Sequence, residues 1–421
     1  MFTASLRLLA FAFLLDTAQD ADWPQWRGPS RDGHVPSGDI LLKALPTEAK
    51  IVWRAKVGDG LASPVVAGGK VVYLDNQDGV ETVHAADAVT GAVQWNTRLD
   101  EAFKDSQSTP GPRCTPLVDD WRVFAQSCRG ELKCLDLRNG KLLWRVSYVT
   151  NFGAVFIGEK GAAAGAVRHG YNGSPLINGK HLITIAGSTN GAAIVCLDKT
   201  TGAIVWKSQN DTAAYAPPIL ASVAGQTQVI AFTVDGLIGL DPATGRLFWR
   251  VPFKTTFGRH VTTPVVSGDI VTISSHQFGM VGTRITRSGE NFSAAPAWTN
   301  KEAAINFSSP VIVDGFLYGI GPAKNVVCVE MATGKIAWSK AGVITSSADK
   351  AHGGFLVMGN NILILTDSGQ LALFAADSKE CRELGRLQVC GTTWCNPAYA
   401  GGKLWLRDAK ELLCVDLAPA R

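Results

Sequence analysis

ADAVTGAVQW, residues 86–95, is the stretch that decides the fold of this chain, because its pattern recurs. An acidic residue is followed by a turn glycine, Gly91 in this copy, and then by a tryptophan, Trp95. The same order returns at residues 135–144, 197–206, 240–249 and 329–338. Aspartate with a glycine that tolerates positive φ is the chemistry of a tight hairpin turn. Repeats tens of residues long predict an array of small structural units.

The other half of each unit is an apolar run that opens on proline. In the first unit we expect an inner strand at 65–66, then strands at 70–74, 82–86 and 92–95. Proline suits the first position of a strand because it has no N–H to donate to a neighbouring strand. Each unit is thus predicted to be a four-stranded sheet that buries its face on the next sheet, as in a β-propeller. The eight inner-strand starts are Pro64, Pro116, Pro175, Pro218, Pro264, Pro310, Gly354 and Pro397.

The ends of the repeat region predict how the ring closes. The eighth unit stops at Leu417 without an outer tryptophan strand, whereas a strand-like segment at 51–55 precedes the first unit. The fold is therefore predicted to be all-β, an eight-bladed β-propeller of four-stranded antiparallel blades, closed by an N-terminal strand. The tryptophans of the outer strands offer large apolar faces to the neighbouring blades. We interpret these tryptophans as structural blade-docking residues: Trp53, Trp95, Trp144, Trp206, Trp249, Trp298 and Trp338.

Three regions follow from this pattern: a signal peptide at 1–20, an extended N-terminal arm at 21–50 and the propeller at 51–421. Residues 8–15 form an apolar core behind Arg7, which is typical of an export signal. No apolar run reaches the length of a transmembrane helix. A net charge of +4 without a basic block gives no support to nucleic-acid binding. We expect a periplasmic or secreted protein.

The nine cysteines do not follow a disulfide pattern. Four of them recur on the third strand of different blades, where a small buried side chain packs well. Cys128, Cys381 and Cys390 are outside this register. A bridge between two of these three stays open at this point.

The repeat, with its Ala-x-Asp-x-x-Thr-Gly-x-x-x-Trp motif, resembles the pyrroloquinoline-quinone (PQQ) repeat family of eight-bladed propellers. The lead-in at residues 22–33, DWPQWRGPSRDG, is similar to that of exported bacterial members. The resemblance implies an extended arm that lies against the ring. The family contains quinone-dependent alcohol or sugar dehydrogenases and also non-enzymatic scaffolds of the outer membrane. The motif does not separate them, because its residues build blades.

Polar residues gather in the connections that lead from one blade to the next inner strand. In a propeller these connections meet at one mouth of the ring, where a binding site is expected. Arginine and histidine prevail over carboxylates there, with Asp349 and Glu302 as the nearest acids. We expect a cationic mouth that binds an anionic small molecule or an acidic peptide segment, or a protein partner in the cell envelope. The candidate ligand-binding residues are Arg113, Arg168, His169, Tyr171, Asn172, Tyr215, Arg259, His260, Asn306, His352 and Trp394.

The alternative is a PQQ-dependent alcohol or sugar dehydrogenase. Such an enzyme needs a divalent cation held by oxygen ligands and a carboxylate that acts as general base. In the methanol-dehydrogenase type, two adjacent cysteines form a ring against the cofactor, and this sequence has no Cys-Cys pair. We therefore expect a non-enzymatic binding or scaffold protein without catalytic residues, metal or cofactor. PQQ with calcium belongs only to the alternative.

Overall fold

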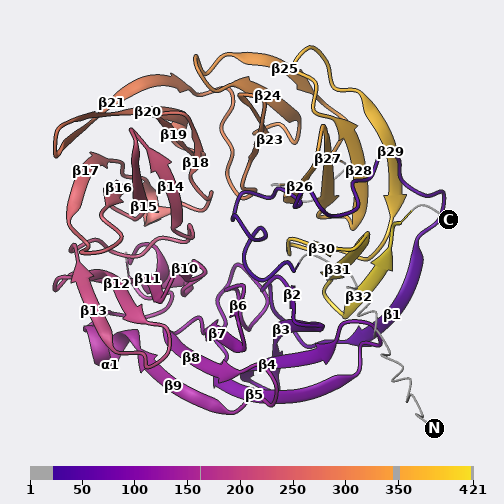
Figure 1. Ribbon diagram of the computed structural model, residues 1–421, viewed down its shortest axis with the longest axis horizontal. Coiled ribbons are helices and arrows are strands. Elements are labelled where there is room, and N and C mark those ends of the chain that lie inside the picture. The colour runs from indigo at the N-terminus through magenta and orange to yellow at the C-terminus, as the bar shows by residue number, and fades with distance from the viewer. Residues whose placement is uncertain (1–21, 162, 345–350, 419–421) are drawn as a thin grey trace, which may run out of the picture.

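Eight four-stranded sheets stand around a central axis in the computed structural model, which describes residues 22–161, 163–344 and 351–418 (Figure 1). Every sheet is antiparallel, and its strands follow one another outward from the axis. The prediction of an eight-bladed β-propeller is confirmed. The predicted signal peptide at 1–20 lies outside the described residues. In the part of the chain that the structure describes, no helix is both long and apolar enough to cross a membrane.

The blades are numbered here from the first inner strand. Blades 1 to 4 contain β2 (Val65–Ala67), β3 (Lys70–Gln77), β4 (Val80–Asp87) and β5 (Val93–Glu101); β6 (Leu117–Asp119), β7 (Arg122–Gln126), β8 (Glu131–Asp136) and β9 (Leu142–Ser147); β10 (Leu176–Asn178), β11 (His181–Ser188), β12 (Ala192–Asp198) and β13 (Ile204–Ser208); and β14 (Ile219–Val223), β15 (Gln226–Phe232), β16 (Gly236–Leu240) and β17 (Leu247–Pro252).

Blades 5 to 8 complete the ring. They contain β18 (Val265–Ser267), β19 (Ile270–Ser275), β20 (Gly279–Ser288) and β21 (Asn291–Asn300); β22 (Val311–Val313), β23 (Phe316–Ile320), β24 (Val326–Glu330) and β25 (Ile336–Lys340); β26 (Gly353–Met358), β27 (Asn361–Thr366), β28 (Gln370–Ala375) and β29 (Glu383–Gln388); and β30 (Ala398–Ala400), β31 (Lys403–Arg407), β32 (Glu411–Asp416) and β1 (Lys50–Lys56). Short helical segments occur in two inter-blade connections: α1 (Tyr148–Phe152), α2 (Ala166–His169) and the 3₁₀ turn η1 (Thr256–Gly258).

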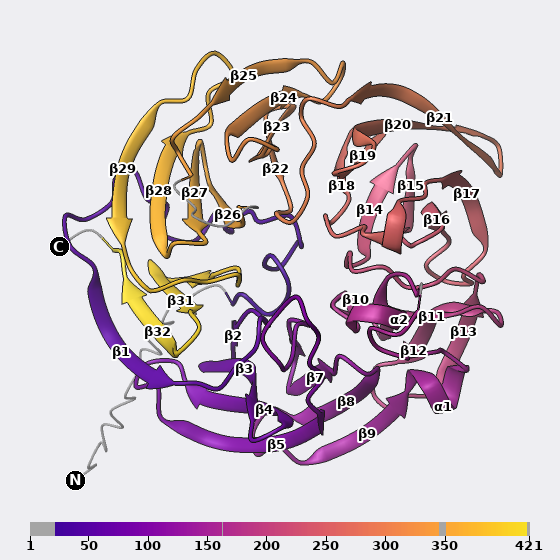
Figure 2. The ribbon, with the colours of Figure 1, turned by 180° about the vertical axis from the view of Figure 1, so that it is seen from behind.

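The ring closes as the sequence predicted. Strand β1 pairs antiparallel with β32, and Arg54 lies opposite Leu413 in this register. The last blade thus takes its outer strand from the N-terminal part of the chain. Both ends of the propeller meet in this one sheet, as both views of the ring show (Figures 1 and 2). Closure removes the open sheet edge that would otherwise invite pairing with other chains.

The outer-strand tryptophan reaches the turn of the next blade. The indole of Trp95 donates from Nε1 to the carbonyl of Leu137 at 2.8 Å, and its ring covers Gly140. A Cβ on Gly140 would lie 2.6 Å from that ring, so the turn requires glycine for space as well as for its φ of 72°. The indoles of Trp53, Trp144, Trp206, Trp298 and Trp338 likewise donate to a carbonyl of the following blade.

Trp249 is an exception to this pattern. Its indole donates to Gln228 Oε1 in the same blade, at 2.6 Å. The following blade lacks the Asp-x-x-Thr-Gly turn of the repeat, because β20 and β21 extend into a long hairpin that turns at Gly289. Trp249 still packs with Val271 and Val281 of that blade.

The recurring cysteines lie opposite these tryptophans in the sheet. Cys134 pairs with Trp144, Cys196 with Trp206, Cys328 with Trp338 and Cys414 with Trp53. A small side chain is needed there because the indole lies against the neighbouring strand, and Gly239 fills the same place opposite Trp249. All nine cysteines are free thiols. The bridge left open for Cys128, Cys381 and Cys390 is absent from the structure.

The N-terminal arm, residues 22–49, runs into the centre of the ring (Figure 1). Trp23 pairs with Val66 on the inner strand of blade 1, and the Pro24 carbonyl accepts from the Val118 N–H of blade 2. The chain turns and leaves along blade 7, where Val35 and Val357 share a hydrogen bond of 2.9 Å. The sequence led us to expect an arm against the ring. The structure places its irregular backbone on the inner side of the ring, where the N–H and C=O groups of short inner strands offer partners.

Two buried arginines hold the tip of the arm. Arg31 donates from Nη1 to the Pro175 carbonyl at 2.7 Å and from Nη2 to the Ser174 carbonyl at 3.0 Å. Arg27 donates from Nη2 to the Pro310 carbonyl on the far side of the ring, in blade 6. Burial lowers the pKa of Arg31 to about 9 and that of Arg27 to about 10, so both are protonated at neutral pH. The arm is therefore anchored by charged hydrogen bonds to backbone oxygens.

Candidate functional site

A cavity of about 260 Å³ lies at the mouth of the ring. Each of the eight inter-blade connections contributes at least one residue to it, and the arm contributes Trp26. Trp26 donates from its indole to Thr263 Oγ1 at 3.0 Å, which fixes the arm beneath the blade-5 connection. We call this space the mouth cavity. Its lining is Trp26, Leu61, Ser63, Asp105, Gln107, Ser108, Arg113, His169, Asn172, Tyr215, Pro217, Arg259, Val261, Phe307, Ser309, His352, Trp394 and Asn396.

One backbone register explains much of this lining. The residue three positions before the inner-strand proline lines the mouth cavity in seven blades: Leu61, Arg113, Asn172, Tyr215, Val261, Phe307 and Trp394. In near-extended chain, successive side chains point to opposite sides. A position facing the axis is therefore flanked by positions that face the blades. Blade 7, which begins with glycine instead of proline, places His352 in the cavity.

Seven of the predicted ligand-binding residues line the mouth cavity, and four do not. Those that line it are Arg113, His169, Asn172, Tyr215, Arg259, His352 and Trp394. Tyr171, His260 and Asn306 are all one residue further from the proline, at the position that faces away. The Tyr171 hydroxyl donates to the Ala186 carbonyl at 3.0 Å inside blade 3. Proximity to the strand start groups these residues with the lining in the sequence, but the alternation of the backbone turns them away from the mouth cavity.

His260 is fully buried against blade 4. Its Nδ1 lies 2.6 Å from the Thr233 carbonyl, and its ring stacks on Phe232 with centroids 4.2 Å apart. Burial lowers the pKa of His260 to about 4, so the imidazole is neutral at physiological pH. Arg168 lies beside the mouth cavity, where it donates to the Gly161 carbonyl and covers the ring of Phe257.

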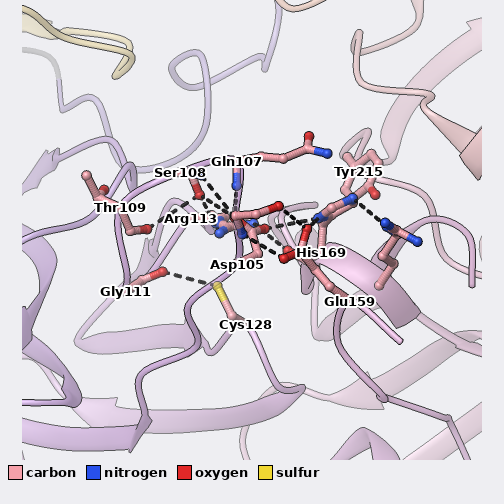
Figure 3. Close-up of polar contacts among 12 residues, drawn as sticks. Asp105, Gln107, Ser108, Thr109, Gly111, Arg113, Cys128, Glu159, His169 and Tyr215 are labelled. Carbon is pink, nitrogen blue, oxygen red and sulfur yellow. Dashed lines mark hydrogen bonds and ion pairs between the residues drawn. The ribbon is translucent and has the colours of Figure 1, made fainter. Parts of the chain in front are cut away.

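Asp105 is the residue that the sequence reasoning missed, and it organises the polar side of the mouth cavity (Figure 3). Its Oδ2 accepts from Arg113 Nη1 at 2.9 Å and lies 3.0 Å from His169 Nδ1. Its Oδ1 accepts from the backbone N–H groups of Gln107 and Ser108, each at 3.0 Å. Burial alone raises the pKa of this carboxyl, but the hydrogen bonds and the charge of Arg113 lower it to about 2. Asp105 is an anion that neutralises Arg113.

Glu81 is buried below this cluster. Its Oε2 accepts from the Cys128 N–H at 3.2 Å, whereas Oε1 has no hydrogen-bond partner in the described structure. Burial raises the pKa of Glu81 to about 7. The carboxyl is thus half-protonated near neutral pH, and a proton lost there creates a charge that water cannot reach.

The charge of the mouth differs from the one expected. Asp105 lies between Arg113 and His169, so these two predicted cationic residues face an acid. Asp349, one of the expected acids, lies outside the described residues. Within the described lining, Arg259 is the arginine without an ion pair or side-chain hydrogen bond. One guanidinium therefore faces the mouth cavity with its donors free.

No three His, Cys, Asp or Glu side chains come together as metal ligands in residues 22–161, 163–344 and 351–418. Asp105 is the one carboxylate among the described residues that line the mouth cavity. Its two oxygens already accept five hydrogen bonds, from Gln107, Ser108, Arg113 and His169. This lining does not fit the oxygen-rich cage of a calcium ion.

Comparisons with known proteins place the chain among propellers of this kind. A curated relative, the outer membrane protein assembly factor BamB of Moranella endobia (strain PCIT), is 22% identical over 274 residues. The match spans 63% of this chain and 64% of that protein, less than two thirds of its length.

Two solved structures share the fold. The crystal structure of BamB from Moraxella catarrhalis matches with a TM-score of 0.60 at 16% identity, covering 87% of this chain and 99% of that one. Quinohemoprotein alcohol dehydrogenase from Comamonas testosteroni matches with a TM-score of 0.62 at 14% identity, covering 95% and 81%. At these identities the likeness shows the fold alone.

The family model described as outer membrane protein assembly factor BamB matches residues 39–164 and, in a second match, residues 111–340. These matches cover blades 1 to 6, the closing strand and the mouth lining from Leu61 to Ser309. The chain belongs to this family of PQQ-like β-propellers.

Proposed function

We propose that this protein is a non-enzymatic binding propeller of the cell envelope and that the mouth cavity is its binding site. The observation that carries the proposal is the common lining: all eight inter-blade connections and Trp26 of the arm meet at one cavity of about 260 Å³. Loops on a rigid ring are a usual place for binding residues. The arm supplies a floor, so a ligand enters and leaves by the same opening.

A location in the cell envelope is supported by two independent features. The sequence predicts an export signal at 1–20, and the family model and the curated relative both carry the name of an outer-membrane assembly factor. A protein partner in the envelope fits this setting.

The charges support an anionic ligand, either a small molecule or an acidic peptide segment. Arg113 is neutralised by Asp105 at 2.9 Å, whereas Arg259 has no acidic partner within the described lining. A guanidinium with free donors binds a carboxylate through two parallel hydrogen bonds. The expected cationic mouth is thus reduced to a single free arginine.

The quinone-dependent dehydrogenase is the competing function. Its calcium ion would need several oxygen ligands, and the one carboxylate of the described lining is saturated by Arg113, His169 and backbone N–H groups. A saturated carboxylate with a pKa of about 2 is also a weak general base. The residues present therefore fit a binding site better than this catalytic one.

Two measurements test the proposal. Reconstitution with PQQ and calcium, followed by a dye-linked alcohol and sugar oxidation assay, is expected to give no turnover; turnover that chelation abolishes would overturn it. Protein purified from its own envelope is expected to carry a ligand that mass spectrometry detects. Arg259→Gln should lose this ligand. The matched control Arg246→Gln, at an arginine that lies near Glu290 and does not line the mouth cavity, should keep it. Equal retention by both variants would remove the mouth cavity as the site.

A further inference from the structure

The mouth cavity has two chemically different halves. Aromatic rings come from the consecutive connections that lead into blades 6, 7 and 8: Phe307, His352 and Trp394. The rings of His352 and Trp394 stack with centroids 5.5 Å apart and planes 13° apart, and Phe307 lies 5.4 Å from Trp394. Together with Trp26 they form an apolar wall and floor.

The other half is polar and comes from the connections into blades 2 to 5. Asp105, Arg113 and His169 are bound to one another there, and Asn172 and Arg259 follow along the ring. A ligand that fits both halves needs an apolar face and a polar rim. Its size is limited, because about 260 Å³ is below the roughly 300–1,000 Å³ of pockets for drug-sized ligands.

Two polar atoms of the lining, one in each half, have no partner in the described structure. Asn172 Oδ1 is buried and accepts no hydrogen bond, and His352 Nδ1, on a side chain only 6% exposed, has no partner. Buried polar atoms are costly unless something satisfies them. An amide oxygen needs a donor, which a simple carboxylate anion lacks and a hydroxyl supplies. Hydroxyl groups therefore complement this lining, as does the negative charge that Arg259 attracts.

We propose that the mouth cavity binds a sugar acid, meaning a six-membered ring that carries several hydroxyls and one carboxylate. This inference rests on the proposed function and names its ligand class. The C–H face of the ring lies against the aromatic half, and the carboxylate meets Arg259. The hydroxyls meet Asn172 and His352. An acidic peptide satisfies the charge but presents few hydroxyls, and a folded partner does not enter a cavity of this size.

Titration calorimetry with sodium D-glucuronate tests this assignment, with D-glucose, succinate and a hexaglutamate peptide as comparison ligands. Glucuronate is expected to saturate one site, and glucose to bind at least tenfold more weakly because it lacks the charge. Succinate should show no saturable binding, because it lacks both hydroxyls and a ring face.

The variants separate charge from shape. Arg259→Gln should weaken glucuronate about tenfold, the loss expected for a charged hydrogen bond of about 1.5 kcal/mol, and leave glucose unchanged. The control Arg246→Gln, outside the mouth cavity, should leave the affinities for glucuronate and glucose unchanged. Trp394→Leu should weaken both sugars, and circular dichroism checks its fold. If it fails to fold, the two arginine variants decide alone.

The results that overturn the inference are distinct from those that overturn the function. Glucuronate binding that is absent, or equal in the parent and Arg259→Gln, removes the sugar acid. If the peptide then binds in an Arg259-dependent way, the mouth cavity stands as the binding site for a different class. If no probe binds and Arg259→Gln keeps the native ligand, the proposed function falls as well.

Discussion

Asp105 and Arg113, eight residues apart in one inter-blade connection, form a buried ion pair with Oδ2 and Nη1 at 2.9 Å. The carboxylate side chain is 1% exposed and the guanidinium side chain 8%. Removing one member leaves the other charge buried without its partner. We predict that Asp105→Asn lowers the free energy of unfolding by about 3–5 kcal/mol. Urea denaturation measures it, and Asp120→Asn, at a carboxylate 65% exposed, should cost less than about 1 kcal/mol.

The same ion pair makes the stability of the protein depend on pH in the acidic range. Because the pKa of Asp105 in the folded protein is about 2, below its ordinary 3.8, its stabilisation is complete above that ordinary value. It is lost as the pH falls from about 4 toward 2. A melting temperature that drops between pH 4 and 2 in the parent, and less in Asp105→Asn, is the expected result. Parallel curves would show that the pair does not govern acid stability.

The buried Glu81 carboxyl should make stability depend on pH in the opposite direction. Burial raises its pKa from 4.5 to about 7, so its favourable protonated form persists at acidic pH and is lost as the pH rises through 7. Glu81→Gln keeps the acceptor for the Cys128 N–H without the ionisation. The variant should gain stability relative to the parent as the pH rises from 5 to 8.5. Glu101→Gln, at an exposed surface carboxylate, should show a constant difference across the same thermal melts.

The docking tryptophans give a prediction on blade contacts. Trp95 is 8% exposed, covers Gly140 and donates to Leu137, so Trp95→Ala should cost about 3–5 kcal/mol in chemical denaturation. Trp121, which is 38% exposed and covered by Arg122, is the control. Trp121→Ala should cost much less. Equal losses at both positions would contradict the docking role.

Deletions separate the two parts of the N-terminal segment. Removing residues 22–58 deletes β1 and exposes the edge of β32, so the ring should unfold or aggregate. Removing residues 22–42 keeps β1 and should give a folded monomer with a lower melting temperature and no floor to its mouth cavity. Light scattering and thermal melts compare them. A monomeric 22–58 deletion with parental melting would contradict closure by β1.

The sequence predicted the blades because their signals are local. Most units repeat a turn glycine, a tryptophan and a small residue opposite it, as in Gly140, Trp144 and Cys134, and these contacts recur with the repeat. The mouth was predicted only in part. Arg113 and Asn172 belong to the repeating register before the proline, whereas Asp105 lies far from any strand start in a long irregular connection. Its role depends on His169 of another connection, and no local pattern carries that contact.

The path of the arm through the ring escaped prediction for a related reason. Residues 22–49 have no strand or helix periodicity, and their hydrogen-bond partners are backbone groups of distant blades, such as the carbonyl of Pro310 for Arg27. A hydrogen bond to a backbone group does not require a particular residue type at the partner position, so the sequence does not reveal it. Only the three-dimensional closure of the ring brings them within reach.

The arm contacts four blades that are spaced around the ring. Trp23 binds blade 1 and Val35 binds blade 7 through backbone hydrogen bonds, and the guanidinium groups of Arg31 and Arg27 donate to backbone carbonyls of blades 3 and 6. A ring with one blade fewer or more would have a different diameter and would leave the two buried guanidinium groups without acceptors. The contacts of the N-terminal arm thus fit a ring of eight blades. Its contacts with blades 6 and 7 can form only when those blades are in place, although the arm precedes them in the chain.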